Sequence, residues 1–112
     1  MPINNLVYLC HENAVNHGFW ESAGKEKQEI ALLLSKIALV HSELSEMTEW
    51  IRKDRNKESD HIPEITGVEE ELADVLIRIF DFAGYLRVNL ERAVMLKMNY
   101  NQNRQYMHGK KA

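Results

Sequence analysis

Apolar side chains recur every three to four residues along most of the chain, which is the spacing of amphipathic helices. The longest such run predicts a helix over about residues 25–54, and neither glycine nor proline interrupts it. Its apolar positions are Ile30, Leu33, Leu34, Ile37, Val40, Leu44, Met47 and Ile51. A second stripe predicts a helix over about residues 67–87, and shorter runs predict helices over about residues 3–16 and 89–102.

Residues with capping and helix-ending chemistry flank these runs. Thr66 and Glu69 have the spacing of a capping box, Asn89 can cap the last helix, and Gly18 ends the first. No stretch alternates with period two for long enough to predict a strand. The pattern therefore predicts an all-α fold, a four-helix bundle formed by a single domain over residues 1–112.

Composition limits the kinds of partner and the cellular compartment that we expect for this protein. Charged residues make up 28% of the 112 residues and the net charge is −3, so no basic field favours nucleic acid as a partner. The single cysteine, Cys10, excludes an intrachain disulfide and fits a reducing compartment. No apolar run approaches the ~18 residues of a membrane span, and the first residues lack a secretory signal. We expect a cytoplasmic protein without a membrane partner.

Two carboxylate pairs stand out against this ordinary background. Glu43 and Glu46 are spaced i, i+3, and so are Glu71 and Asp74. On a helix this spacing places both side chains on one face. Each pair borders the apolar stripe of its own helix, so antiparallel packing of the two stripes would bring the pairs together. Four carboxylates so close repel one another unless a cation lies among them.

An isolated pair of this kind is usually a solvated helix surface. The second pair, at a matching offset from its apolar stripe, favours a site instead. Lysine or arginine partners at i+4 are also scarce, since only Asp74 has one, Arg78. Ligands that are all oxygen select Mg²⁺ first and Mn²⁺ next. Because Mg²⁺ takes its other ligands from water and substrate phosphates, the pattern indicates phosphate-ester or phosphoanhydride chemistry.

These motifs resemble the metal-binding signature of the all-α nucleoside triphosphate pyrophosphohydrolases, which include MazG, the dimeric dUTPases and phosphoribosyl-ATP pyrophosphohydrolase. The resemblance covers nearly the whole chain and is greatest with short, single-domain MazG-like proteins. The segments that carry it are His41-Ser42-Glu43-Leu44-Ser45-Glu46, Glu70-Glu71-Leu72-Ala73-Asp74-Val75-Leu76-Ile77-Arg78 and Lys97-Met98-Asn99-Tyr100-Asn101-Gln102-Asn103-Arg104.

The resemblance implies hydrolysis of an NTP or dNTP to the monophosphate and pyrophosphate, with a role in nucleotide-pool control. It implies that Mg²⁺, with Mn²⁺ as a substitute, is held by the catalytic acids Glu43, Glu46, Glu71 and Asp74. It also implies a homodimer or homotetramer whose sites draw on two chains. dUTPase-like and phosphoribosyl-ATP pyrophosphohydrolase-like specificities are the alternatives within the superfamily.

The last predicted helix supplies the implied phosphate ligands. Lys97 and Asn101 match the superfamily's Lys-x-x-x-Asn pattern, which reaches the phosphates, and Arg104 is a candidate to assist them. The chain departs from many relatives at Ser42, where they carry an additional acid. The general base therefore stays open among the four acids.

Three further residues are candidates for a base-binding pocket. Trp20 either caps the core or stacks on the nucleotide base. Trp50, one turn beyond Glu46, either lines the same pocket or belongs to a subunit interface. Asp81 either contacts the base or sugar or is solvated or ion-paired, and the second reading is favoured.

Other classes fit less well. A di-iron bundle needs Glu-x-x-His pairs on facing helices, and the one such pair, Glu58 and His61, lies in a predicted loop. A calcium loop over residues 54–65 would lack its turn glycine and its terminal glutamate. A helical interaction module without enzymatic activity stays open, and it would need no divalent metal.

Overall fold

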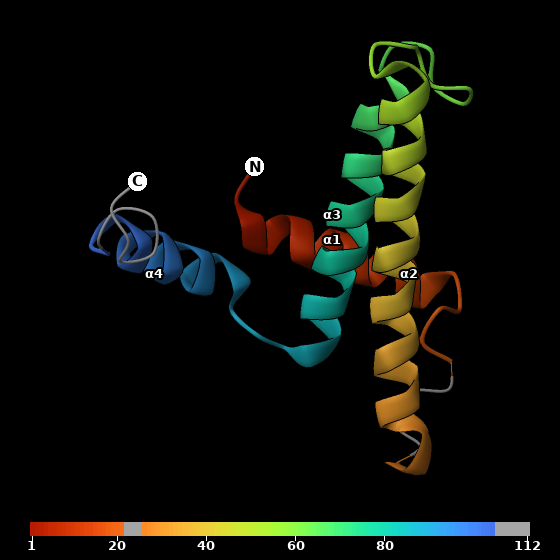
Figure 1. The fold of residues 1–112 in the computed structure, drawn as a ribbon. Coiled ribbons are helices and arrows are strands. Elements are labelled where there is room, and N and C mark those ends of the chain that lie inside the picture. The colour runs from red at the N-terminus through yellow and green to blue at the C-terminus, as the bar shows by residue number, and fades with distance from the viewer. Residues whose placement is uncertain (22–25, 105–112) are drawn as a thin grey trace.

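The computed structural model describes residues 1–21 and 26–104. It contains four helices, α1 (Ile3–Asn16), α2 (Glu26–Asp54), α3 (Gly67–Leu86) and α4 (Leu90–Gln102) (Figure 1). Within these two ranges the only β-type pairing is an isolated antiparallel bridge between Glu58 and Thr66. The all-α fold with four helices is confirmed, and each predicted boundary lies within one residue of the observed one.

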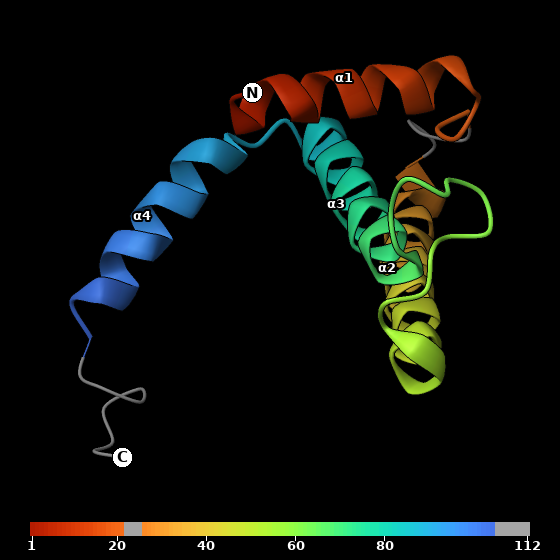
Figure 2. The same ribbon diagram turned by 90° about the horizontal axis from the view of Figure 1, so that it is seen from above.

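Helices α2 and α3 lie side by side and antiparallel, as both views show (Figures 1 and 2). Helix α1 crosses this pair and packs mainly on α3. Helix α4 contacts α1 and projects away from the α2–α3 pair (Figure 2). The antiparallel pair is therefore the part of the fold that can bring the two acidic motifs together.

Capping interactions determine where α3 begins. The Thr66 hydroxyl accepts a hydrogen bond from the Glu69 backbone N–H at 3.0 Å, and the Glu69 carboxylate accepts one from the Thr66 N–H at 2.9 Å. This reciprocal pair is the predicted capping box. The Asn89 side chain likewise caps α4 by accepting from the Arg92 N–H at 3.0 Å. A fixed start for α3 fixes the register of Glu71, which lies one turn further on.

The loop between α2 and α3 is tied to both helices. Ser59 N–H donates to the Ile65 carbonyl at 2.8 Å, and Gly67 N–H donates to the Lys57 carbonyl at 3.0 Å. Gly67 packs against the Trp50 ring, which occupies the space that a Cβ atom would need. Helix α3 can therefore start directly against the indole because residue 67 has no side chain.

Much apolar surface stays exposed on the single chain. Few apolar side chains are buried in the described ranges, and they are Val7, Ala14, Trp20 and Ala83. Along α2, Ile30 is 73% exposed, Leu34 60% and Ile51 54%. The apolar stripe of α2 is therefore largely uncovered in the single chain. No helix in the described part of the chain is long and apolar enough to cross a membrane.

Candidate metal centre

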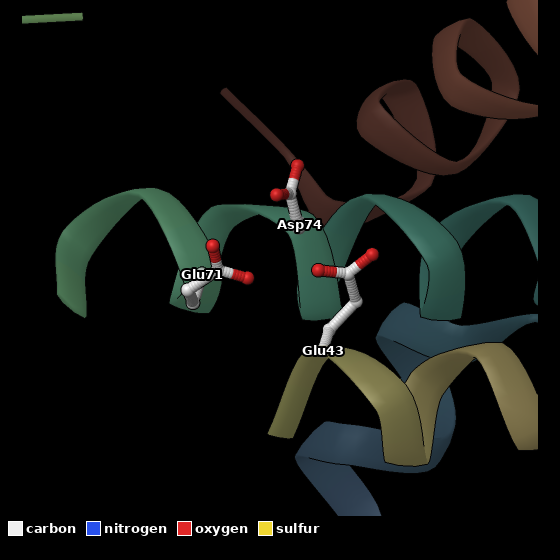
Figure 3. A group of neighbouring side chains, drawn as sticks. All are labelled: Glu43, Glu71 and Asp74. Carbon is white, nitrogen blue, oxygen red and sulfur yellow. The ribbon is translucent and has the colours of Figure 1, made fainter. Parts of the chain in front are cut away.

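Three of the four predicted acids converge between α2 and α3. Glu43 comes from α2, and Glu71 and Asp74 come from α3 (Figure 3). One carboxylate oxygen from each lies within 4.8 Å of the other two. The i, i+3 spacing places Glu71 and Asp74 on one face of α3, and antiparallel packing places Glu43 opposite them. This group is called the carboxylate cluster below.

The surroundings of the cluster disfavour negative charge. Burial is the main cause that raises the pKa of Glu71 to about 7, and a hydrogen bond with Glu43 and the charges of Glu43, Asp74 and Glu46 add to it. Burial, followed by the charge of Glu43, also raises the pKa of Asp74. Within the described residues, Oε2 of Glu71 is buried and has no hydrogen-bond partner. A buried acceptor among like charges is what a bound cation would satisfy.

Arg78 pairs across the helix interface and not along its own helix. The sequence offered it as the i+4 partner of Asp74, but its Nε and Nη2 atoms both lie 3.0 Å from Oε1 of Glu43. The Glu43 side chain is only 15% exposed in this pair. The guanidinium still acts on Asp74 at longer range, where its charge opposes the rise in pKa. Arg78 thus holds Glu43 toward the cluster.

Glu46 lies at the margin of the cluster. It is exposed, and it does not belong to the group of three converging oxygens. Its charge still contributes to the raised pKa of Glu71. Glu46 also lines a cavity of about 240 Å³ at the end of α2, here called the loop-side cavity, whose other lining residues are Glu49, Trp50, Lys53, Lys57 and Asp60. Trp50 therefore shares a cavity with Glu46 of the first acidic motif.

A second cavity lies on the other side of the cluster, toward the turn that follows α1. It has a volume of about 240 Å³ and is lined by Phe19, Lys36, Leu39, Arg78 and Asp81, and we call it the aromatic-side cavity. A smaller neighbouring cavity of about 140 Å³ is lined by both Asp74 and Asp81. Phe19 is 55% exposed, so its ring is accessible to a ligand in this region.

Trp20 and Asp81 belong to the core. The Trp20 indole N–H donates to Oδ1 of Asp81 at 2.8 Å, and Nδ1 of His11 lies 2.8 Å from the same oxygen. The Trp20 ring stacks on Tyr85 with centroids 4.2 Å apart. Trp20 is 7% exposed and Asp81 8%. The structure favours the core-capping alternative for Trp20 and places Asp81 beside it as a buried hydrogen-bond partner of Trp20 and His11. Of the neighbouring aromatic residues Phe19 and Trp20, Phe19 is the accessible one.

Lys36 has a role that sequence spacing alone did not indicate. Its Nζ atom donates to the Phe19 carbonyl at 2.6 Å and lies 4.7 Å from the centroid of the Trp20 ring. A cation over an aromatic face is stabilised by the ring quadrupole. The lysine therefore holds the turn that carries Phe19 and Trp20, here called the aromatic turn, against α2. The sequence signal was its place two turns before Glu43, on the side of α2 that carries the acids.

The predicted phosphate ligands lie elsewhere in the single chain. Lys97 and Asn101 are on α4, which projects away from α2 and α3 (Figure 2). Nζ of Lys97 lies 4.6 Å from the Tyr100 ring centroid, and the Arg104 guanidinium lies 5.4 Å from the same centroid. One chain therefore brings three acids together but does not bring the α4 residues to them.

The donor set of the cluster fits a hard divalent cation. All three converging side chains offer carboxylate oxygens, and one of those oxygens is buried without a partner in the described part of the chain. Mg²⁺ and Mn²⁺ favour such ligands, whereas softer metals favour sulfur and imidazole. Glu43, Glu71 and Asp74 are the residues that would hold the ion.

Comparison with known proteins gives one informative similarity. Over 90 residues the chain is 29% identical to dCTP pyrophosphatase 1 from Bos taurus, a match that covers 80% of this chain and 51% of the relative. The chain thus spans about half the length of this relative. No protein-family model matches the chain, and no solved structure matches it. The similarity to a nucleotide pyrophosphatase agrees, at a coarse level, with the resemblance seen in the acidic motifs.

Proposed function

We propose that this protein is a Mg²⁺-dependent pyrophosphohydrolase that converts a nucleoside or deoxynucleoside triphosphate to the monophosphate and pyrophosphate. The observation that carries the proposal is the convergence of Glu43, Glu71 and Asp74, together with a buried Oε2 of Glu71 that has no hydrogen-bond partner among the described residues. The similarity to dCTP pyrophosphatase 1 supports phosphoanhydride chemistry and makes dCTP the first substrate to test. Mn²⁺ is the expected substitute metal.

Mg²⁺ bound by the cluster would neutralise charge on the phosphate oxygens and lower the pKa of a bound water. The residues of the chain contribute orientation and proton transfer. Arg78 orients Glu43, and the capping box fixes the register of Glu71. Water attacks the α-phosphorus, the bond to the bridging oxygen breaks, and its electron pair leaves with pyrophosphate. One of the four acids accepts the proton of the water and releases it to solvent.

The exposed apolar surface supports assembly into a homodimer or homotetramer. The stripes of α2 and α3 remain largely uncovered in one chain, and α4 extends away from them. In such an assembly, Lys97, Asn101 and Arg104 of one copy reach phosphates bound at the carboxylate cluster of another. The proposed setting is the cytoplasm, where the enzyme would remove or regulate nucleotides of the pool.

A substrate panel tests the proposal. The protein is incubated with each NTP and dNTP in the presence of Mg²⁺, and the products are separated by ion-exchange chromatography. We expect equal amounts of monophosphate and pyrophosphate from at least one nucleotide, and no turnover when Mg²⁺ is chelated. Orthophosphate as the sole phosphate product, or no turnover with any nucleotide, would contradict the proposal. The second result would favour the helical interaction module.

Matched variants connect the activity to the cluster. Glu71→Gln keeps the shape of the side chain but removes its charge, so kcat/KM should fall by about 100-fold or more. Glu64→Gln is the control, because Glu64 is exposed in the loop before α3 and belongs neither to the carboxylate cluster nor to the lining of either cavity beside it. The control should keep kcat/KM within about twofold. Equal activity of Glu71→Gln and wild type would show that the cluster takes no part in the reaction.

A further inference from the structure

We infer that the loop-side cavity binds the pyrophosphate end of the substrate, with Lys53 and Lys57 as its phosphate ligands. The nucleoside end then lies in the aromatic-side cavity, on the other side of the carboxylate cluster. This inference rests on the proposed function and gives the bound substrate a direction along α2. It assigns a binding role within the single chain to two residues outside both acidic motifs.

The first support is the face that α2 presents to the loop-side cavity. Glu43, Glu46, Trp50 and Lys53 follow one another at intervals of three and four residues, so they share one side of the helix. Helical side chains lean toward the N-terminus of their helix, so Lys53 extends back over Trp50 toward Glu46. The cavity that Glu46 and Lys53 both line is thus continuous with the acidic row.

The second support is the fixed position of Lys57. Its carbonyl accepts from the Gly67 N–H at 3.0 Å, and the adjacent bridge between Glu58 and Thr66 holds the loop against the start of α3. Gly67 lies one helical turn before Glu71. Lys57 is therefore tied by its backbone to the same helix end that positions Glu71, although it lies outside any helix.

The third support is the position of the lysine side chains that have no ion-pair partner among the described residues. In the described part of the chain, no carboxylate lies within ion-pairing distance of Lys53 or Lys57. In the aromatic-side cavity, by contrast, Arg78 is paired with Glu43, and Lys36 donates to the Phe19 carbonyl. Among the cations that line the two cavities, those without a carboxylate or carbonyl partner within residues 1–21 and 26–104 are thus on the loop side.

The balance of charge in the loop-side cavity agrees with this assignment. Its acids are Glu46, Glu49 and Asp60, of which Glu49 already pairs with Arg52. A metal ion at the adjacent cluster would offset the charge of Glu46. Two lysines then oppose a single acid, Asp60, and the cavity favours an anion. The aromatic-side cavity, with Phe19 and Leu39 in its wall, offers apolar surface suited to a nucleobase instead.

Product binding tests the direction directly. Isothermal titration calorimetry measures the affinity of Mg²⁺-pyrophosphate and, separately, of the nucleoside monophosphate for wild type, Lys53→Gln, Lys57→Gln and the double variant. We expect each single variant to weaken pyrophosphate binding about 5- to 10-fold and the double variant more, with monophosphate binding changed less than twofold. Arg55→Gln is the matched control, since Arg55 is an exposed cation between Lys53 and Lys57 that does not line the cavity.

Each other outcome overturns the inference. Unchanged pyrophosphate affinity in the double variant, or a wild type that binds no pyrophosphate, removes the lysines from the site. A selective loss of monophosphate affinity reverses the direction. Circular dichroism confirms that each variant is folded before titration. The substrate panel distinguishes failure of this inference from failure of the proposed function. Turnover together with unchanged pyrophosphate binding in the variants would reject the role of the lysines and keep the proposed function. Absence of turnover would reject the proposed function itself.

Discussion

Arg78 donates from both Nε and Nη2 to a single oxygen, Oε1 of Glu43, with both distances at 3.0 Å. The pair crosses from α3 to α2 at the level of the carboxylate cluster. It therefore joins the two helices at the point where three carboxylates would otherwise repel one another. The guanidinium supplies one positive charge, which offsets only part of the negative charge of the cluster.

Loss of this pair should destabilise the fold by a measurable amount. Arg78→Gln is expected to lower the free energy of unfolding by about 1 kcal/mol, between the values for a surface ion pair and a charge-assisted hydrogen bond. The intermediate value follows because the Arg78 side chain is 36% exposed and that of Glu43 is 15% exposed. Urea denaturation of the metal-free protein gives the difference. Adding Glu43→Gln should recover part of the loss, because the unpaired carboxylate is then removed.

The control for this measurement is Arg52→Gln. Arg52 and Glu49 form an i, i+3 pair whose side chains are 74% and 57% exposed, so its removal should change the free energy of unfolding by less than about 0.5 kcal/mol. A loss for Arg78→Gln no larger than the loss for the control would mean that the interhelical pair contributes nothing to stability.

The metal-free protein should lose stability as pH rises from about 5 to 8. The pKa of Glu71 is about 7 in the folded chain against an ordinary value of 4.5, and the pKa of Asp74 shifts in the same direction. The folded state therefore binds more protons than the unfolded state between these values, so the free energy of unfolding falls with rising pH. Thermal unfolding followed by circular dichroism across this range measures the effect.

Two comparisons make the pH prediction specific. Glu71→Gln cannot ionise at this position, so its stability should vary less with pH over the same range. Saturating Mg²⁺ should restore most of the wild-type loss at pH 8, because a ligand that binds only the folded state stabilises it. Metal-free wild-type protein whose stability is constant or rises between pH 5 and 8 would contradict the assigned shifts.

The sequence predicted the helices well because their signals are local. Periodic apolar positions and the capping chemistry of Thr66 and Asn89 define the four elements to within one residue. The same periodicity located Glu43, Glu71 and Asp74 on the faces where α2 and α3 meet, since the i, i+3 spacing fixes each face. Antiparallel packing was the one tertiary assumption that this required.

Features that depend on the placement of whole helices were not predictable in this way. Spacing along one helix suggested Arg78 as a partner for Asp74, whereas packing gives it to Glu43. Nothing in the periodicity of residues 89–102 indicates that α4 extends from α1 and leaves the α2–α3 pair. The burial of Trp20 against Tyr85 likewise depends on how α1 crosses α3. Helical periodicity specifies faces, but the partner of each face comes from the tertiary fold.

A residue larger than glycine at position 67 should lower the free energy of unfolding as long as Trp50 is present. A Cβ atom at residue 67 would overlap the Trp50 ring, so Gly67→Ala is expected to cost about 1–3 kcal/mol through overpacking. The same substitution in a Trp50→Leu background should cost less, because the smaller side chain leaves room. Urea denaturation of the four proteins completes a double-mutant cycle. Equal costs in both backgrounds would show that the indole does not set the requirement for glycine.

Asp81 should behave as a core residue and not as a base-reading residue. Its Oδ1 atom accepts from the Trp20 indole at 2.8 Å and lies 2.8 Å from Nδ1 of His11. Asp81→Ala leaves the buried indole N–H without this partner and should lower the free energy of unfolding by about 2–3 kcal/mol. Asp81→Asn keeps an oxygen acceptor for Trp20, so its loss should be smaller. Denaturation followed by near-ultraviolet circular dichroism reports both the stability and the packing of Trp20.

Substrate selectivity separates this structural role from base recognition. If Asp81 acts through packing alone, Asp81→Asn should scale kcat/KM for all accepted nucleotides by a similar factor, because the aromatic turn as a whole is loosened. A residue that contacts the base would instead change the ratio of kcat/KM between pyrimidine and purine nucleotides at little cost in stability. Such a change in ratio would mean that Asp81 contacts the base. A uniform change would mean that selectivity comes from residues with accessible surface, and Phe19 is the first candidate among these.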